Sequence, residues 1–171
     1  MKSFKLTELD KAIDYVRYLD AEEQFDEIEI DSRTLQLKIN SVQLEDPIKI
    51  LLKPKDEVIT FSDELEKYLS RRSKIFHAFK YLKDNFADKD DSVDTGFDIL
   101  DNARVLIEKA NSDKEIVFVI NHKDEEILVS IAMKIDKYEN GFFETRVFQS
   151  EEKMHLGKVK EMLDKFEAAL R

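Results

Sequence analysis

Apolar residues recur at steps of three and four positions in four stretches of the chain, and this spacing predicts four amphipathic α-helices. The first is expected over residues 8–23. The longest is expected over 61–89, where the Ser62 hydroxyl can cap the first turn. A shorter helix is expected over 97–110, and a last one opens at Ser150. Helical segments are therefore expected in both halves of the chain.

Between the first two helices, apolar and polar residues alternate, which is the period of strands with one buried face. Residues 25–31 and 35–39 predict a hairpin, and 48–52 and 58–61 predict two further strands. We therefore expect four strands before the longest helix.

Strand signals return in the second half of the chain. Residues 116–120 are a continuous apolar run, typical of a strand that is buried on both faces and central in its sheet. Residues 127–135 predict the next strand. Asn140-Gly141 is a favoured pair for a type I′ turn and predicts a hairpin into a strand over 142–148.

These elements predict an α+β fold, with antiparallel sheets packed against long amphipathic helices in the order α-ββββ-α-α-βββ-α. A chain of 171 residues is long enough for a single domain over residues 1–171. An alternative is two related halves, 1–89 and 95–171, because both show a similar order of elements. Leu-Asp-Lys-Ala at 9–12 is echoed by Leu-Asp-Asn-Ala at 100–103.

Composition narrows the class of protein. The absence of cysteine excludes disulfides, thiolate metal ligands and cysteine nucleophiles. We expect a cytoplasmic protein without a membrane segment, because no apolar run approaches about 18 residues and the N-terminus lacks the pattern of a signal peptide. The net charge of −10 disfavours direct nucleic-acid binding and favours a basic partner.

Motifs for catalysis are weak throughout the sequence. The three histidines fall in different predicted elements without a metal-ligand spacing: His77, His122 and His155. Residues 88–94 space oxygen ligands as a calcium loop does, yet Val93 and Ile99 stand where such a loop needs glycine and glutamate. The three glycines are isolated from one another, so no phosphate-binding loop is formed. We therefore predict a protein that is not an enzyme and has no metal or cofactor.

An acidic row precedes the longest helix and is the first candidate for a partner-binding surface. Residues 20–31 hold seven acids and no cation: Asp20, Glu22, Glu23, Asp26, Glu27, Glu29 and Asp31. On a strand, the last three would face one side at steps of about 6.8 Å. Such a row resembles a stretch of phosphate backbone and predicts a nucleic-acid mimic. The alternative is an ordinary solvated face of a sheet.

The longest helix carries the second candidate surface, in the only segment with more cations than acids. Residues 62–89 hold 7 Lys/Arg against 5 Asp/Glu. A basic face there is formed by Lys67, Arg71 and Lys74, with His77 and Tyr81 beside them. Cations next to an aromatic ring can hold a phosphate or stack a base. The alternative is that these cations pair with acids of a neighbouring element or of a second subunit.

The order of the predicted elements, in a small acidic chain without cysteine, resembles that of the type III secretion chaperones. The resemblance implies a binding protein that forms a homodimer, and the helix expected over 97–110 departs from it. Our leading hypothesis is a non-catalytic acidic protein-binding module, such as an inhibitor, immunity or anti-defence protein, that acts on a basic partner. Three alternatives remain: a chaperone-like binding protein, a nucleic-acid-associated protein that uses the basic face of residues 62–88, and a hydrolase with dispersed residues.

Overall fold

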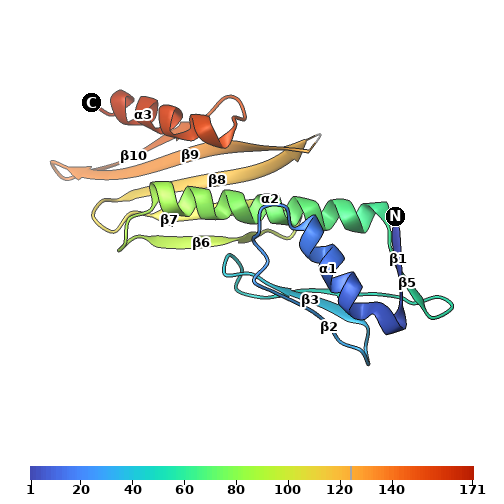
Figure 1. The fold of residues 1–171 in the computed structure, drawn as a ribbon. Helices are drawn as coiled ribbons and strands as arrows, with labels where there is room; N and C mark the ends of the chain where they lie inside the picture. The colour runs from blue at the N-terminus through green and yellow to red at the C-terminus, as the bar shows by residue number, and fades with distance from the viewer. Residues whose placement is uncertain (124) are drawn as a thin grey trace. The chain divides into compact units, whose positions relative to one another are not determined.

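A computed structural model describes residues 1–123 and 125–171 of the chain (Figure 1). The chain divides into two compact units, Met1–His77 and Ala78–Arg171. The division falls within the long helix α2 (Asp63–Phe86), which confirms the helix expected around 61–89. Each unit contains antiparallel strands and helical residues, so the predicted α+β class with antiparallel sheets is confirmed.

The first unit contains a three-stranded sheet, a two-stranded sheet and helix α1 (Leu9–Leu19), which follows a short 3-10 turn, η1 (Leu6–Glu8). The three-stranded sheet has the order β2 (Glu27–Ile30), β3 (Gln36–Asn40), β4 (Ile48–Leu51). The second sheet pairs β1 (Lys2–Lys5) with β5 (Val58–Phe61). Its core includes Ala12, Val16, Leu37, Ile39, Ile59 and Phe61, each fully buried. The strands expected at 25–31, 35–39, 48–52 and 58–61 are confirmed, whereas β1 was not predicted.

The second unit is built on a five-stranded antiparallel sheet of the order β10-β9-β8-β7-β6. Its strands are β6 (Ser92–Phe97), β7 (Ala103–Glu108), β8 (Lys114–Lys123), β9 (Glu126–Glu139) and β10 (Phe142–Gln149). Each strand pairs with the next strand in the sequence, so the colour changes steadily across the sheet in Figure 1. The central position expected for residues 116–120 is confirmed, because β8 is the middle strand.

One face of this sheet forms the core of the second unit. Alternate residues along β7, β8 and β9 are buried, namely Val105, Ile107, Phe118, Ile131 and Met133. Helix α3 (Val159–Ala169), which follows the short 3-10 turn η2 (Leu156–Lys158), packs on this face: the Phe148 and Phe166 rings stack with centroids 5.7 Å apart. The end of α2 also contributes, since the Phe86 and Phe118 rings are 5.8 Å apart.

The opposite face of the sheet is more open. Val117 and Val119 point away from the core and are only half-buried, so the expectation that this strand is buried on both faces is wrong. Arg104 on β7 and Lys134 on β9 are exposed on the same face. The alternation of buried and open positions is typical of an antiparallel sheet with one solvated face.

The helix predicted over 97–110 is wrong, because this segment forms the end of β6, a tight turn and β7. The Asp98 carboxylate accepts the backbone N–H groups of Leu100 and Asn102, both at 2.9 Å, and this closes the turn. Asp101 has a φ of 63°, which is outside the right-handed helical region. The two similar sequences therefore adopt different structures: residues 9–12 are helical, whereas residues 100–103 form a turn and the start of a strand.

The last helix begins later than predicted. Residues 150–155 form no helix: the Ser150 Oγ accepts the Ile131 N–H, and the Met154 backbone pairs with Val129. The helix α3 therefore begins only at Val159. The Asn140-Gly141 hairpin is confirmed: the φ angles are 53° and 83°, as a type I′ turn requires.

Candidate functional site

Asp20, the first acid of the predicted row, is 6% exposed and lies just beyond α1. Its carboxylate accepts the backbone N–H groups of Gln24 and Phe25, both at 2.8 Å. It also accepts the Ser73 hydroxyl of α2 at 2.5 Å. Asp20 therefore organises the chain that leaves α1, and it is not part of the solvent-facing acidic surface.

The other six acids of the row are exposed but differ in their engagement: Glu22, Glu23, Asp26, Glu27, Glu29 and Asp31. The Asp26 carboxylate accepts the Val42 N–H at 2.5 Å. Asp31 lies beyond β2, where its carboxylate accepts the N–H groups of Arg33 and Thr34. Only Glu27 and Glu29 lie on β2 itself, on either side of the buried Ile28. The regularly spaced part of the row is thus two carboxylates long.

The predicted basic face of α2 is shorter than expected. Lys67 and Arg71 are exposed, whereas Lys74 and His77 are half-buried. His77 Nδ1 lies 3.9 Å from the Glu22 carboxylate, so this end of the face adjoins the acidic loop.

Tyr81 falls in the second unit, where its ring meets that of Phe86 with centroids 6.4 Å apart. Of the predicted basic face, Lys67, Arg71, Lys74 and His77 thus lie in the first unit, and Tyr81 lies in the second.

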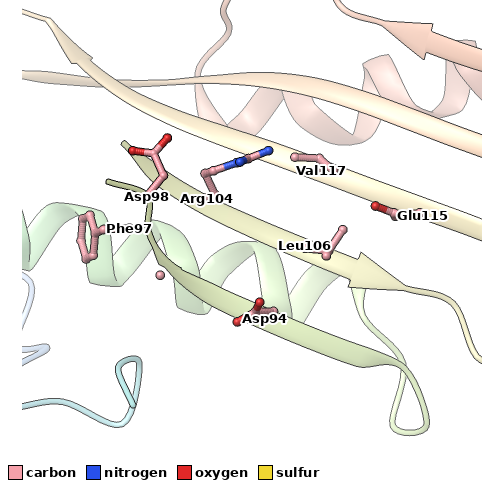
Figure 2. Close-up of a pocket in the computed structure, with 8 residues that line it drawn as sticks. Asp94, Phe97, Asp98, Arg104, Leu106, Glu115 and Val117 are labelled. Carbon is pink, nitrogen blue, oxygen red and sulfur yellow. The ribbon is translucent and has the colours of Figure 1, made fainter. Parts of the chain in front are cut away.

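A cavity of about 340 Å³ lies over the open face of the five-stranded sheet. It is lined by Asp94, Gly96, Phe97, Asp98, Arg104, Leu106, Glu115 and Val117. Figure 2 shows the Arg104 side chain extending over this face between Asp98 and Val117. The Asn102 N–H chiefly lowers the pKa of Asp98, and the Arg104 charge adds to this effect. Three carboxylates and one guanidinium suit a polar, cationic ligand group more than a phosphate.

A second cavity, of about 410 Å³, is lined by residues of α2, α3 and the sheet. Three lysines reach it, but each has an acidic partner. Lys114 pairs with Glu167, and Lys160 with Asp164 at 2.9 Å. Lys109 lies 2.9 Å from Asp91. These ion pairs neutralise the cations, so the cavity offers little excess charge to an anion.

The β9–β10 hairpin exposes large apolar side chains that sequence reasoning missed. Tyr138 is 75% exposed, Phe142 78%, Phe143 67% and Val147 56%. The signal that could have revealed them is the run Phe142 to Phe148, which places apolar residues on both faces of one strand. Exposed apolar groups gathered in one element are typical of protein contact surfaces.

Groups of three or more His, Asp or Glu residues that could hold a metal are not found within residues 1–123 and 125–171. Across the same ranges, none of the helices is long and apolar enough to cross a membrane. Comparison with protein-family models, with curated protein sequences and with solved structures gives no match for this chain.

Proposed function

We propose that this chain is a non-catalytic, cytoplasmic protein-binding module whose first unit contacts a basic partner through the acids of β2 and the loop before it. The observation that carries the proposal is the arrangement on β2, an edge strand of its sheet. Glu27 and Glu29 are exposed there, while Ile28 between them is held in the core. The two carboxylates are thereby fixed on the solvent side of a packed strand.

The loop before β2 enlarges this surface. Glu22 and Glu23 are exposed, and the hydrogen bonds to Asp20 hold the backbone that follows them. A partner with lysines or arginines at matching positions gains attraction that speeds association and weakens in salt. An inhibitor, immunity or anti-defence protein that covers a basic groove would use such a surface, including one that normally holds nucleic acid.

The experiment compares two variants with the same change in charge. Glu27→Lys/Glu29→Lys alters the proposed surface, and Glu151→Lys/Glu152→Lys alters two exposed acids elsewhere. Each chain is immobilised and exposed to an extract of its source cells at low and high salt. We expect one basic protein to be retained by the wild type and by the control, and to fall at least about 10-fold with the first variant and in high salt.

Two results would overturn the proposal. One is that no retained protein depends on salt. The other is that both variants retain the same proteins in the same amounts. The partner identified is then mixed with the purified chain, so that direct binding is measured by calorimetry.

Nucleic-acid binding by α2 receives less support, because His77 adjoins the Glu22 carboxylate. A labelled oligonucleotide that binds at low salt, and is released by Lys67→Glu, Arg71→Glu and Lys74→Glu together, would favour that alternative.

A further inference from the structure

Strand β10 lies at one end of the five-stranded sheet and pairs with β9 along residues 142–149. Seven of its eight residues are exposed. An edge strand of this length presents backbone N–H and C=O groups that can pair with another strand. Its exposed apolar side chains make such pairing favourable, because they would lose contact with water.

The register shows which backbone groups of β10 point outward. The two-residue turn closes on the pair Glu139–Phe142, which makes that pair hydrogen-bonded. The Ser150 N–H donates to the Ile131 carbonyl at 2.9 Å, so Ser150 also faces β9. Since the direction alternates along an antiparallel strand, the groups of Phe143, Thr145 and Val147 point away from β9.

The sequence of β10 is complementary to itself about Thr145. In an antiparallel pair of two copies with Thr145 at the two-fold axis, Glu144 lies opposite the Arg146 of the other copy, and Phe143 lies opposite its Val147. Phe142 likewise lies opposite the second Phe148. Both charges thus meet an opposite charge, and every apolar residue meets an apolar one.

We propose that the chain forms a homodimer in which the β10 strands of two copies pair antiparallel about Thr145, joining two five-stranded sheets into one. The outward groups of Phe143, Thr145 and Val147 then supply about six backbone hydrogen bonds. This dimer is independent of the acidic surface on β2, since it uses only the second unit.

The neighbouring registers are less favourable. A two-fold axis at Arg146 sets the two Arg146 side chains of the dimer opposite each other. An axis at Glu144 sets the two Glu144 carboxylates opposite each other, so both registers bring like charges together. Outward-facing residues still meet one another in both registers, so backbone hydrogen bonds alone do not select the register. In the single chain, Arg146 Nε already bonds the Glu144 carboxylate at 3.0 Å, so the two side chains lie near the positions that the pairing needs. Of the three registers, the one centred on Thr145 sets Glu144 and Arg146 opposite each other.

The decisive test is a charge swap followed by sedimentation over a range of concentrations. Arg146→Glu sets two like-charged pairs across the axis, and we expect the dimer to dissociate at least about 10-fold more easily than the wild type. Glu144→Arg/Arg146→Glu restores opposite charges and should restore dimerisation. Lys165→Glu on α3 makes the same change in net charge at an exposed site and should leave the dimer unchanged.

Three outcomes would overturn the proposal: a wild type that stays monomeric at all concentrations, a dimer insensitive to Arg146→Glu, or a double variant that does not recover. Circular dichroism of each variant shows whether it is folded.

Hydrogen exchange resolved by residue gives a second, independent readout on the wild type. The N–H groups of Phe143, Thr145 and Val147 should be protected at high concentration and exchange rapidly on dilution. Those of Glu144 and Arg146 face β9 and should be protected in both conditions. Protection of the first set that does not change with dilution would overturn the pairing.

Discussion

The two outermost strands of the five-stranded sheet, β6 and β10, differ in what their side chains offer to a second strand. On β6, the exposed positions are the polar Ser92 and Asp94. On β10, they include Phe142, Phe143 and Val147. A backbone edge is present in both strands, so side chains decide which one can accept another strand. A charge that meets no opposite charge opposes pairing, whereas exposed apolar residues favour it.

The two edges also differ in how they are anchored. Before β6, the Asp91 carboxylate accepts the N–H groups of Asp88 and Ala110 and the Lys109 ammonium. After β6, Asp98 closes the turn into β7. Strand β10 is held by its turn, by cross-strand contacts such as the Thr145 hydroxyl donating to Asp136 at 2.7 Å, and by the Ser150 hydroxyl, which accepts the Ile131 N–H.

The largest difference in stability should appear when a phenylalanine ring is removed from the central strand and, for comparison, from the edge strand. Phe118→Ala on β8 deletes a fully buried ring, and we expect a loss of about 3–5 kcal/mol in the free energy of unfolding. Phe142→Ala on β10 should change it by no more than about 0.5 kcal/mol. Urea unfolding followed by circular dichroism checks both, and equal losses would break the contrast between centre and edge.

The anchoring of β6 should next appear in the pH dependence of stability. The backbone N–H groups of Asp88 and Ala110, with Lys109, lower the pKa of Asp91 to about 2. This pKa is below the value of about 3.9 in an unfolded chain. The contribution of Asp91 to the free energy of unfolding is therefore complete above about pH 4 and is lost as the pH falls toward 2. Thermal melts across this range should therefore show a weaker pH dependence in Asp91→Asn. An unchanged profile in the variant would contradict this role of Asp91.

Glycine to alanine exchanges should have opposite signs at the two edges. Gly141 has a φ of 83°, so Gly141→Ala should lower stability by about 1 kcal/mol even though an added methyl group meets no atom within 4 Å. Gly96 on β6 is equally open but lacks a positive φ, and Gly96→Ala should raise stability by about 0.5 kcal/mol. Urea midpoints of both variants test the pair, and a shared sign would contradict it.

The smallest effect on stability should come from giving β10 the character of β6. Val147→Lys places a charge at a position that is 56% exposed, so the free energy of unfolding should change by no more than about 0.5 kcal/mol. Self-association should nevertheless be lost, because the charge would lie in the paired edge. Sedimentation beside urea unfolding separates the two quantities. A dimer that survives this change would show that another surface holds it.

Periodicity predicted most elements correctly where one period dominated, as in α2 and in the strands of the first unit. It failed over 97–110, where Leu100 and Leu106 complete a helical spacing although Leu100 lies in a turn and is 82% exposed. The underlying signal was the alternation of Ala103, Val105 and Ile107 with polar or half-buried residues. Tertiary pairing with β8 selects the strand, and a local pattern does not include that partner.

The candidate surfaces were less accessible to sequence reasoning than the fold. Charge alone placed Asp20 in the acidic surface, whereas its carboxylate accepts hydrogen bonds from the backbone N–H groups of Gln24 and Phe25. Conversely, Phe143 and Val147 are exposed although residues of their type are usually buried. Which apolar residues stay exposed depends on where the sheet ends, and only the strand order reveals this.

The order of the strands has a consequence for how fast each unit can fold. Every pair in the five-stranded sheet joins consecutive strands, so this sheet can grow by adding one hairpin at a time. In the first unit, β1 must wait for β5, since Lys2 pairs with Phe61. Contacts between distant parts of a chain slow folding, because a long loop must close first. The first unit precedes the second in the chain and is synthesised earlier. Its two-stranded sheet nevertheless has the longer loop to close, so we expect that sheet to form more slowly.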